Sequence, residues 1–210
     1  MKSFLLYTST LLMKVVLRLF FKLEIEGQER IPTTGRIILA PNHQSNWDPP
    51  LVGIASERSV FFAAKRQLFD RQPGGYFLNA LHAIPLDRRG FDRSSLRRME
   101  TVLDSGGVLV FFPEGTRSSS GELGRGHDGI GMLALQTRAD LVPVYLTGTR
   151  GARPRIWNRR RFKIRFGEVI SVEPFLESTE PRRQLIHQLS QKVMTGIRAE
   201  QTALLSDSKQ

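Results

Sequence analysis

Two side chains that together could move a proton, a histidine and an aspartate, stand in one short polar segment. His43 and Asp48 belong to the segment NHQSNWD, which follows the apolar run 36–40. On a continuous helix they would point about 140° apart, so they can meet only in a turn, which the flanking prolines favour. A carboxylate bonded to one ring nitrogen leaves the other able to accept a proton from a hydroxyl group. A second interpretation stays open, in which Asp48 caps a helix and His43 is structural.

A second polar turn has the composition of a phosphate-binding site. The apolar run 108–112 leads directly into the segment PEGTRS. Gly115 permits close approach of the backbone, and Arg117 offers a planar fork that matches phosphate oxygens. Thr116 and Ser118 add hydroxyl groups. A solvated turn with a surface arginine is the alternative interpretation of this segment.

Both turns follow short apolar runs, and the elements around them define the fold class. The predicted strands cover residues 23–27, 36–40, 59–64, 82–86, 108–112, 141–146 and 161–166, and the predicted helices cover 49–56, 75–81, 94–105, 130–138 and the chain from 181 onward. Strands that alternate with helices predict an α/β protein, here a single domain with a central mixed sheet flanked by helices. Because polar residues follow two buried strands, we expect both turns at one edge of the sheet. The domain is predicted over residues 23–205, followed by a polar tail, 206–210.

The first 22 residues are predicted to form a separate amphipathic helix at a membrane interface. The stretch is strongly apolar, but Lys14 and Arg18 interrupt it and Lys22 follows. On a helix these cations fall within an arc of about 80°, which is typical of an interfacial helix with basic anchors. The interrupting charges make insertion across the bilayer marginal. A helix packed on the domain is the alternative.

The charge balance indicates an anionic partner. The 210 residues include 31 Lys and Arg against 20 Asp and Glu, a formal net charge of +11. Eight of these cations, and no acidic residue, lie between Arg150 and Arg165. A membrane surface, a phosphorylated substrate or nucleic acid could be the partner, and a basic edge strand is the structural alternative. The absence of cysteine excludes a thiolate nucleophile and a disulfide framework.

Four segments in fixed order resemble the signature blocks of the glycerolipid acyltransferases, the lysophosphatidate acyltransferase family. NHQSNWD and FPEGTRS, about 70 residues apart, resemble the first and third blocks, while IPLDRR and LVPV resemble the second and fourth. An Ala-Lys pair that ends at Lys65 also matches the family. Two positions differ, since His82 stands near a common glycine and GRGHDGIG replaces a common Phe-Lys pair.

The resemblance implies a reaction and a role for each matching residue. It implies transfer of a fatty acyl group from acyl-CoA or acyl carrier protein to the free hydroxyl of lysophosphatidate, which gives phosphatidate. His43 would be the catalytic base and Asp48 its partner. The residues implied to bind the acceptor's phosphate are Lys65, Arg88, Glu114, Gly115 and Arg117. No metal and no cofactor besides the acyl donor is implied, and the enzyme is expected at the cytoplasmic face of the membrane, as a monotopic or peripheral protein.

Several alternatives remain beside this interpretation. Glycerol 3-phosphate, another lysophospholipid or lyso-ornithine lipid could be the acceptor, and a non-enzymatic membrane-binding protein could share the fold. Nucleic-acid binding is not expected, because no helix-turn-helix, zinc-finger or RNP pattern accompanies the basic run. Gly124, Gly126 and Gly129 match a dinucleotide fingerprint but do not follow a predicted strand. His82, His127 and His187 lack the spacing of metal ligands.

Overall fold

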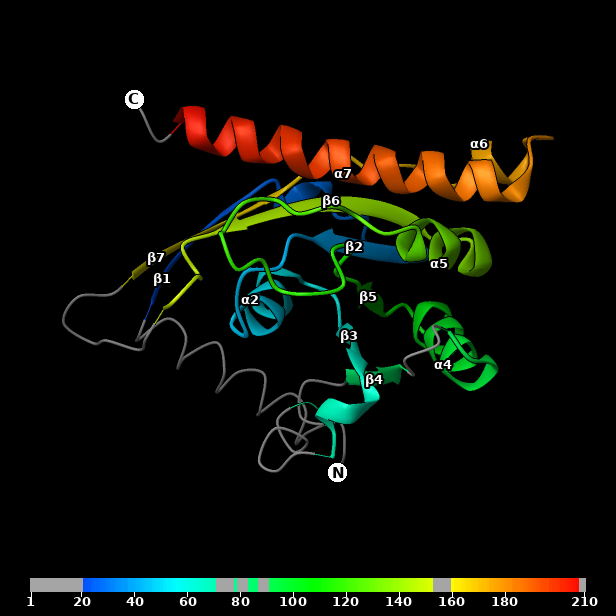
Figure 1. Ribbon diagram of the computed structural model, residues 1–210, viewed down its shortest axis with the longest axis horizontal. Helices are drawn as coiled ribbons and strands as arrows, with labels where there is room; N and C mark the ends of the chain where they lie inside the picture. The colour runs from blue at the N-terminus through cyan, green and yellow to red at the C-terminus, as the bar shows by residue number, and fades with distance from the viewer. Residues whose placement is uncertain (1–20, 71–77, 79–82, 87–90, 153–159, 208–210) are drawn as a thin grey trace.

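The predicted strands form one mixed sheet of seven strands in the order β1-β7-β6-β2-β5-β3-β4 (Figure 1). The computed structural model describes residues 21–70, 78, 83–86, 91–152 and 160–207. The strands are β1 (Phe21–Glu26), β2 (Ile37–Pro41), β3 (Val60–Lys65), β4 (Ala83–Leu86), β5 (Val108–Val110), β6 (Asp140–Thr147) and β7 (Arg160–Phe166). The prediction of an α/β domain with a central mixed sheet is confirmed.

The direction of the strands decides where a site can form. All neighbouring pairs are parallel except β6 and β7, which are antiparallel. The five strands β6, β2, β5, β3 and β4 therefore end at the same edge of the sheet. This edge receives the loops that follow β2 and β5, and it is the edge at which α/β proteins build their sites.

Helices cover both faces of the sheet. The helices are α2 (Asp48–Ala55), α4 (Arg93–Asp104), α5 (Gly129–Thr137), α6 (Glu173–Leu176) and α7 (Arg182–Asp207), with two 3₁₀ turns, η1 (Gln28–Arg30) and η2 (Arg66–Leu68). Figure 1 shows α7 lying along the length of β6, with α2 on the opposite side of the sheet. The predicted helix 75–81 falls almost wholly outside the described residues.

The core consists of two apolar layers, one on each face of the sheet. Ile37 and Leu39 pack with α2, while Ile38 and Ala40 pack with the layer under α4, α5 and α7. All five residues of β2 are buried, so the strand reads as a continuous apolar run because both of its faces are covered. The closing helix α7 contributes one buried residue at each turn, Leu185, Leu189, Val193 and Ile197, as its spacing in the sequence predicts.

The first strand and the last helix each extend two residues beyond the bounds predicted for the domain. Strand β1 begins at Phe21, so the last two residues of the predicted helix 1–22 are strand, and residues 1–20 lie outside the described part. The Phe21 ring is buried and stacks on Phe162 at a centroid distance of 4.4 Å, which holds it in the sheet. At the other end α7 extends to Asp207, into the predicted tail. Among the described residues, no helix is long and apolar enough to cross a membrane.

The basic strand β7 is not an edge strand, because β1 pairs with it in parallel. Acidic residues of β1 and α7 contact its cations. Glu24 lies 3.3 Å from the Lys163 ammonium, and Arg165 contacts both Glu26 and Glu200. Burial alone would lower the pKa of Arg165, but its hydrogen bonds to the two glutamates raise that pKa above its ordinary value. Part of the basic run is thus neutralised inside the fold.

One arginine joins two loops at the opposite edge of the sheet. The Arg58 guanidinium donates hydrogen bonds to the carbonyls of Pro32, Thr34, Gly35 and Gly106, at 2.7 to 3.3 Å. These carbonyls belong to the loops that enter β2 and β5, the two strands that lead to the polar turns. Burial lowers the pKa of the Arg58 guanidinium from its ordinary value.

We predict that Arg58→Lys lowers the free energy of unfolding by about 1–3 kcal/mol, because a single ammonium cannot replace the fork that bonds to the carbonyls of both loops. Urea denaturation followed by circular dichroism measures the change. Arg97→Lys on the exposed face of α4 is the control and should stay within about 0.5 kcal/mol of the parent. Equal midpoints for the two variants would contradict the role given to Arg58.

Candidate active site

The first polar turn is anchored at the end of β2 by a buried asparagine. Asn42 is 1% exposed, and its side-chain amide bonds to both the N–H and the carbonyl of Leu146 in β6, at 2.7 and 3.1 Å. These two bonds take the place of one further pair of backbone hydrogen bonds between β2 and β6. The chain leaves the sheet after this pair, and His43 is the next residue.

His43 and Asp48 meet, as the first interpretation of the sequence predicts. The His43 Nδ1 atom lies 2.9 Å from the Asp48 Oδ2 atom. The same oxygen accepts the backbone N–H groups of Gln44 and Ser45, at 2.6 and 2.7 Å. An oxygen that accepts two N–H groups behaves as a carboxylate, so we assign the Nδ1 proton to His43, which leaves its Nε2 atom as an acceptor.

The Asp48 carboxylate is buried, whereas the histidine reaches the surface. The Asp48 side chain is 0% exposed and the His43 side chain 17% exposed. The His43 ring also stacks on Phe112, with centroids 4.1 Å apart. Asp48 is the first residue of α2 and not its N-cap, which is Trp47. Its side chain closes the preceding turn and orients the imidazole.

The second polar turn touches the first through the backbone. Gly115 has a φ of +66°, which favours glycine, and its N–H bonds to the Phe112 carbonyl at 3.1 Å. The Ser118 N–H donates to the His43 carbonyl at 2.7 Å. The Arg117 side chain is exposed on this turn and bonds to no residue that the structure describes, so it is available to an anion at the edge where His43 lies.

The remaining residues implied to bind phosphate differ in position. Lys65 is the last residue of β3, at the same carboxyl edge of the sheet; its side chain and all of Arg88 lie outside the described part. Glu114 is only 5% exposed, and both its oxygens accept backbone N–H groups, those of His43 and Gly124. The structure therefore places the Glu114 carboxylate below the surface with a backbone donor on each oxygen, and its implied contact with phosphate stays a prediction.

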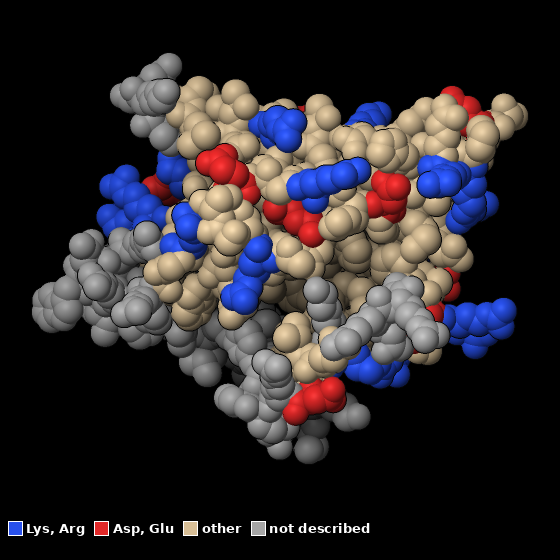
Figure 2. Space-filling view, viewed as in Figure 1, with Lys and Arg blue, Asp and Glu red and all other residues tan. Residues whose placement is uncertain are grey.

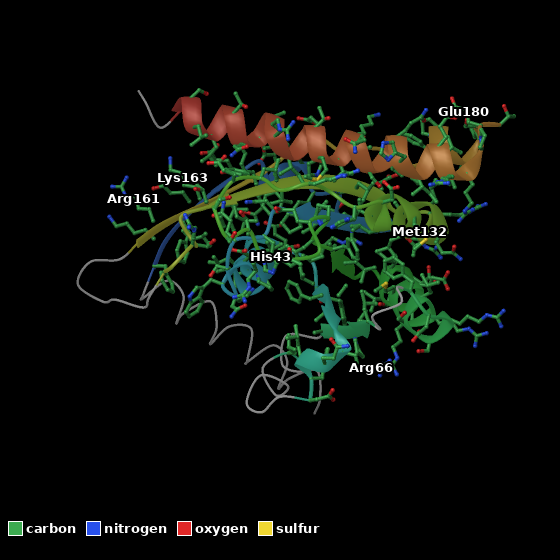
Figure 3. The ribbon with its side chains drawn as sticks, in the orientation of Figure 1. His43, Arg66, Met132, Arg161, Lys163 and Glu180 are labelled. Atoms are coloured by element: carbon green, nitrogen blue, oxygen red, sulfur yellow. The ribbon has the colours of Figure 1, made fainter. Side chains whose placement is uncertain are left out.

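Figure 3 shows the labelled His43 beside α2, and three side chains support it through contacts that the sequence does not predict. These are the Phe112 ring, the Asn42 amide and the Glu114 carboxylate. Asn42 adjoins His43 in the sequence and Glu114 is itself one of the residues that the resemblance implies, but position in the sequence does not reveal a contact, and Phe112 adjoins none of the predicted site residues. A cavity of about 520 Å³ adjoins the turn, lined by Gln44, Gly121, Thr147 and Arg150 among others.

The glycine motif and His187, which lie outside the two polar turns, have roles in packing or surface pairing. Gly124 and Gly126 belong to the segment between the second turn and α5, and Gly129 is the first residue of α5. An added Cβ at Gly126 would meet Met194 of α7 at 2.4 Å. His187 pairs with Asp128 on the surface at 3.1 Å. In the described part of the chain, no three potential metal ligands come together.

Comparison with known proteins identifies the class to which this fold and site belong. Residues 22–147 match the family model "Acyltransferase". These residues are more than half of the chain and contain both polar turns, and the chain therefore belongs to the acyltransferase family.

Similar proteins carry a more specific name. The chain is 27% identical to the 1-acyl-sn-glycerol-3-phosphate acyltransferase of Bacillus subtilis over 185 residues, covering 86% of this chain and 91% of that protein. It is 44% identical to a protein of the same name from Cocos nucifera over 144 residues, 67% of this chain and 45% of the relative. The crystal structure of the 1-acyl-sn-glycerophosphate acyltransferase of Thermotoga maritima superimposes with a TM-score of 0.66 at 25% identity, covering 94% of this chain and 81% of the other.

We predict that Asp48→Asn lowers acyl transfer by about 10²- to 10⁴-fold, because an amide can neither hold His43 in the same tautomer nor stabilise its protonated form. Steady-state turnover measures the effect, and circular dichroism checks the fold. Asp104→Asn, which changes a carboxylate on the surface near Arg36, is the matched control. Parent-like turnover of the Asp48 variant would show that the buried pair does not orient the base.

Proposed function

We propose that this protein is a 1-acyl-sn-glycerol-3-phosphate acyltransferase, which moves a fatty acyl group from a thioester to the free hydroxyl of lysophosphatidate and forms phosphatidate. The observation that carries this proposal is the buried Asp48 carboxylate 2.9 Å from a histidine that reaches the surface. The exposed guanidinium of Arg117 on the adjoining turn adds an anion-binding group. The names of the similar proteins support the same reaction.

The His43 imidazole provides the base for this reaction. Its Nε2 atom takes the proton of the acceptor hydroxyl while the hydroxyl oxygen attacks the thioester carbonyl carbon. The tetrahedral intermediate collapses with cleavage of the carbon–sulfur bond, and the imidazolium returns the proton to the thiolate. The neighbouring Asp48 carboxylate stabilises the imidazolium between these steps. A placed base contributes about 10²- to 10⁴-fold, or roughly 3 to 5 kcal/mol of the barrier.

Binding of the acceptor's phosphate supplies the positioning. In this proposal Arg117 forms the planar contact to the phosphate oxygens, and Lys65 and Arg88 add positive charge. A phosphate held at this edge brings the acceptor hydroxyl near Nε2 and turns a bimolecular encounter into a local one. Gly115 presents its exposed backbone on the same turn.

The donor and the location complete the proposal. Acyl-CoA and acyl carrier protein both present a thioester on a phosphopantetheine arm, and either fits the chemistry of the His43 base. We propose that the enzyme works at the cytoplasmic face of a membrane as a monotopic or peripheral protein, because its acceptor and product are amphiphiles. The apolar residues 1–20, which contain Lys14 and Arg18, supply the anchor, and the overall positive charge supports binding to anionic lipid.

The function is tested by acyl transfer with purified full-length protein. Lysophosphatidate, glycerol 3-phosphate, a lysophosphatidylcholine and lyso-ornithine lipid are compared as acceptors, each with acyl-CoA and acyl carrier protein. We expect the highest kcat/KM with lysophosphatidate, and loss of turnover by at least about 10²-fold in His43→Ala. Unchanged turnover of a folded His43→Ala variant, or preference for another acceptor, would contradict the proposal.

Arg117→Gln tests the phosphate contact separately from the base. Loss of one charge-assisted hydrogen bond pair should raise the KM for lysophosphatidate about 10-fold or more, with a smaller change in kcat. Steady-state kinetics at varied acceptor concentration separates the two constants. Arg198→Gln on the exposed side of α7 is the control and should leave both constants unchanged. An unchanged acceptor KM in the Arg117 variant would remove this residue from the phosphate site.

Charge reversal tests the anchor. The double variant Lys14→Glu, Arg18→Glu should bind phosphatidylglycerol vesicles at least about tenfold more weakly, since each cation near an anionic surface contributes roughly 1 kcal/mol. The same charge change at the start of α7, Arg182→Glu with Arg183→Glu, should have a smaller effect. Sedimentation with vesicles at low and high salt measures both. Equal losses for the two double variants would assign membrane binding to overall charge alone.

A further inference from the structure

Glu114 connects two loops that meet at the histidine. Its Oε1 atom accepts the backbone N–H of His43 at 2.8 Å, and its Oε2 atom accepts the backbone N–H of Gly124 at 2.8 Å. The residue is 5% exposed. A buried carboxylate is costly unless it is fully hydrogen-bonded, and here both oxygens have a donor. The side chain therefore belongs to the support of the turn and has little surface to offer a ligand.

The second polar turn holds the His43 peptide from both sides. Glu114 receives its N–H, and the Ser118 N–H donates to its carbonyl at 2.7 Å. The Asp48 carboxylate fixes the side chain of the same residue. The backbone and the imidazole of His43 thus have separate supports, and Glu114 serves the backbone.

Gly124 shows how closely this contact is fitted. A Cβ atom added at Gly124 would lie 2.6 Å from the Glu114 Oε2 atom, inside van der Waals contact. The loop from Glu114 to Gly124 is consequently closed at its base by one carboxylate, and it carries the exposed Arg117. Glu114 therefore helps to set the position of the loop that holds this guanidinium relative to the imidazole, together with the Ser118 N–H on the His43 carbonyl and the Gln44 amide, which donates to the Gly121 carbonyl at 3.0 Å.

We propose that Glu114 is a positioning residue, which holds His43 and the Arg117 loop in register through two backbone N–H groups and does not contact the acceptor. This inference rests on the proposed acyltransferase function. A carboxylate beside a phosphate would repel it, and a burial of this kind keeps the negative charge away from the anion. We infer this role from the contacts that Glu114, Ser118 and Asp48 make with His43, and not from the sequence block to which Glu114 belongs.

Glu114→Gln is the principal test, because an amide has the same size but can accept only one of the two N–H groups. We expect kcat to fall about 10- to 100-fold, with a smaller rise in the KM for lysophosphatidate, because the Arg117 loop loses the same support. The Arg117→Gln variant should show the opposite pattern. A Glu114 variant that raises the acceptor KM and keeps the parent kcat would overturn the proposal, because that pattern belongs to a residue that binds the acceptor.

A double variant separates positioning from loss of stability. If Glu114 acts mainly through the histidine, adding Glu114→Gln to His43→Ala should lower the residual rate by much less than the roughly 10- to 100-fold expected in the parent. A further 10-fold or larger loss in the double variant would overturn the proposal. Glu200→Gln is the matched control, because it changes another largely buried carboxylate, one that binds Arg165 away from the site. That variant should keep the parent kcat.

Hydrogen exchange of the full-length protein tests the contacts without any assay of activity. In Glu114→Gln the amide that loses its acceptor, that of His43 or that of Gly124, should exchange faster, while the amides in the pair β1 and β7 should not change. Unchanged protection at both amides would overturn the proposal, whether or not the protein acylates any acceptor. A protein that acylates none of the acceptors would contradict the proposed function, but it would not by itself contradict the contacts of Glu114. If Glu114→Gln does not fold, Gly124→Ala displaces the same contact from the other side and should raise exchange at Gly124 while lowering kcat.

Discussion

The site depends on one buried negative charge, the Asp48 carboxylate. Removing a carboxylate from water costs several kcal/mol unless donors surround it, and this structure supplies two backbone N–H groups and one imidazole to a single oxygen. These bonds force the chain between His43 and Asp48 to turn back on itself. The same contacts that stabilise the charge therefore fix the imidazole. The hydrogen bonds that stabilise the turn are therefore the same ones that set the geometry of the base.

Parallel pairing of the central strands brings the histidine turn next to the turn that holds Arg117. β2 and β5 are neighbours and run in the same direction, so the turn that holds His43 and the turn that holds Arg117 leave the sheet side by side. Glu114 and Ser118 then bond to the backbone of His43. Neither turn is positioned by its own sequence alone. Each is held by the other, and both are held by a strand whose two faces are buried in the core.

The net charge of the chain overstates the positive charge that is available to an anionic surface, because some cations are paired with glutamates. Strand β1 lies beside β7, and its glutamates contact Lys163 and Arg165. Figure 2 shows acidic side chains among the basic ones on the face in view, and Figure 3 labels Arg161 and Lys163 at the end of the sheet where β1 and β7 lie. Cations that are neutralised inside the fold contribute less to binding an anionic surface, so the argument for a membrane depends more on residues 1–20 and on the exposed arginines.

The sequence by itself determined the class of fold, the order of the elements and the residues that matter. Apolar runs of strand length and amphipathic spacing report burial directly, which is why β2, β5 and α7 could be predicted. The sequence left open whether Asp48 orients a histidine or caps a helix, and it could not reveal that β1 neutralises β7 or that Glu114 lies beneath the site. Those facts are contacts between distant segments. Only the tertiary structure decides them, because a hydrogen bond across 71 residues depends on which strands become neighbours.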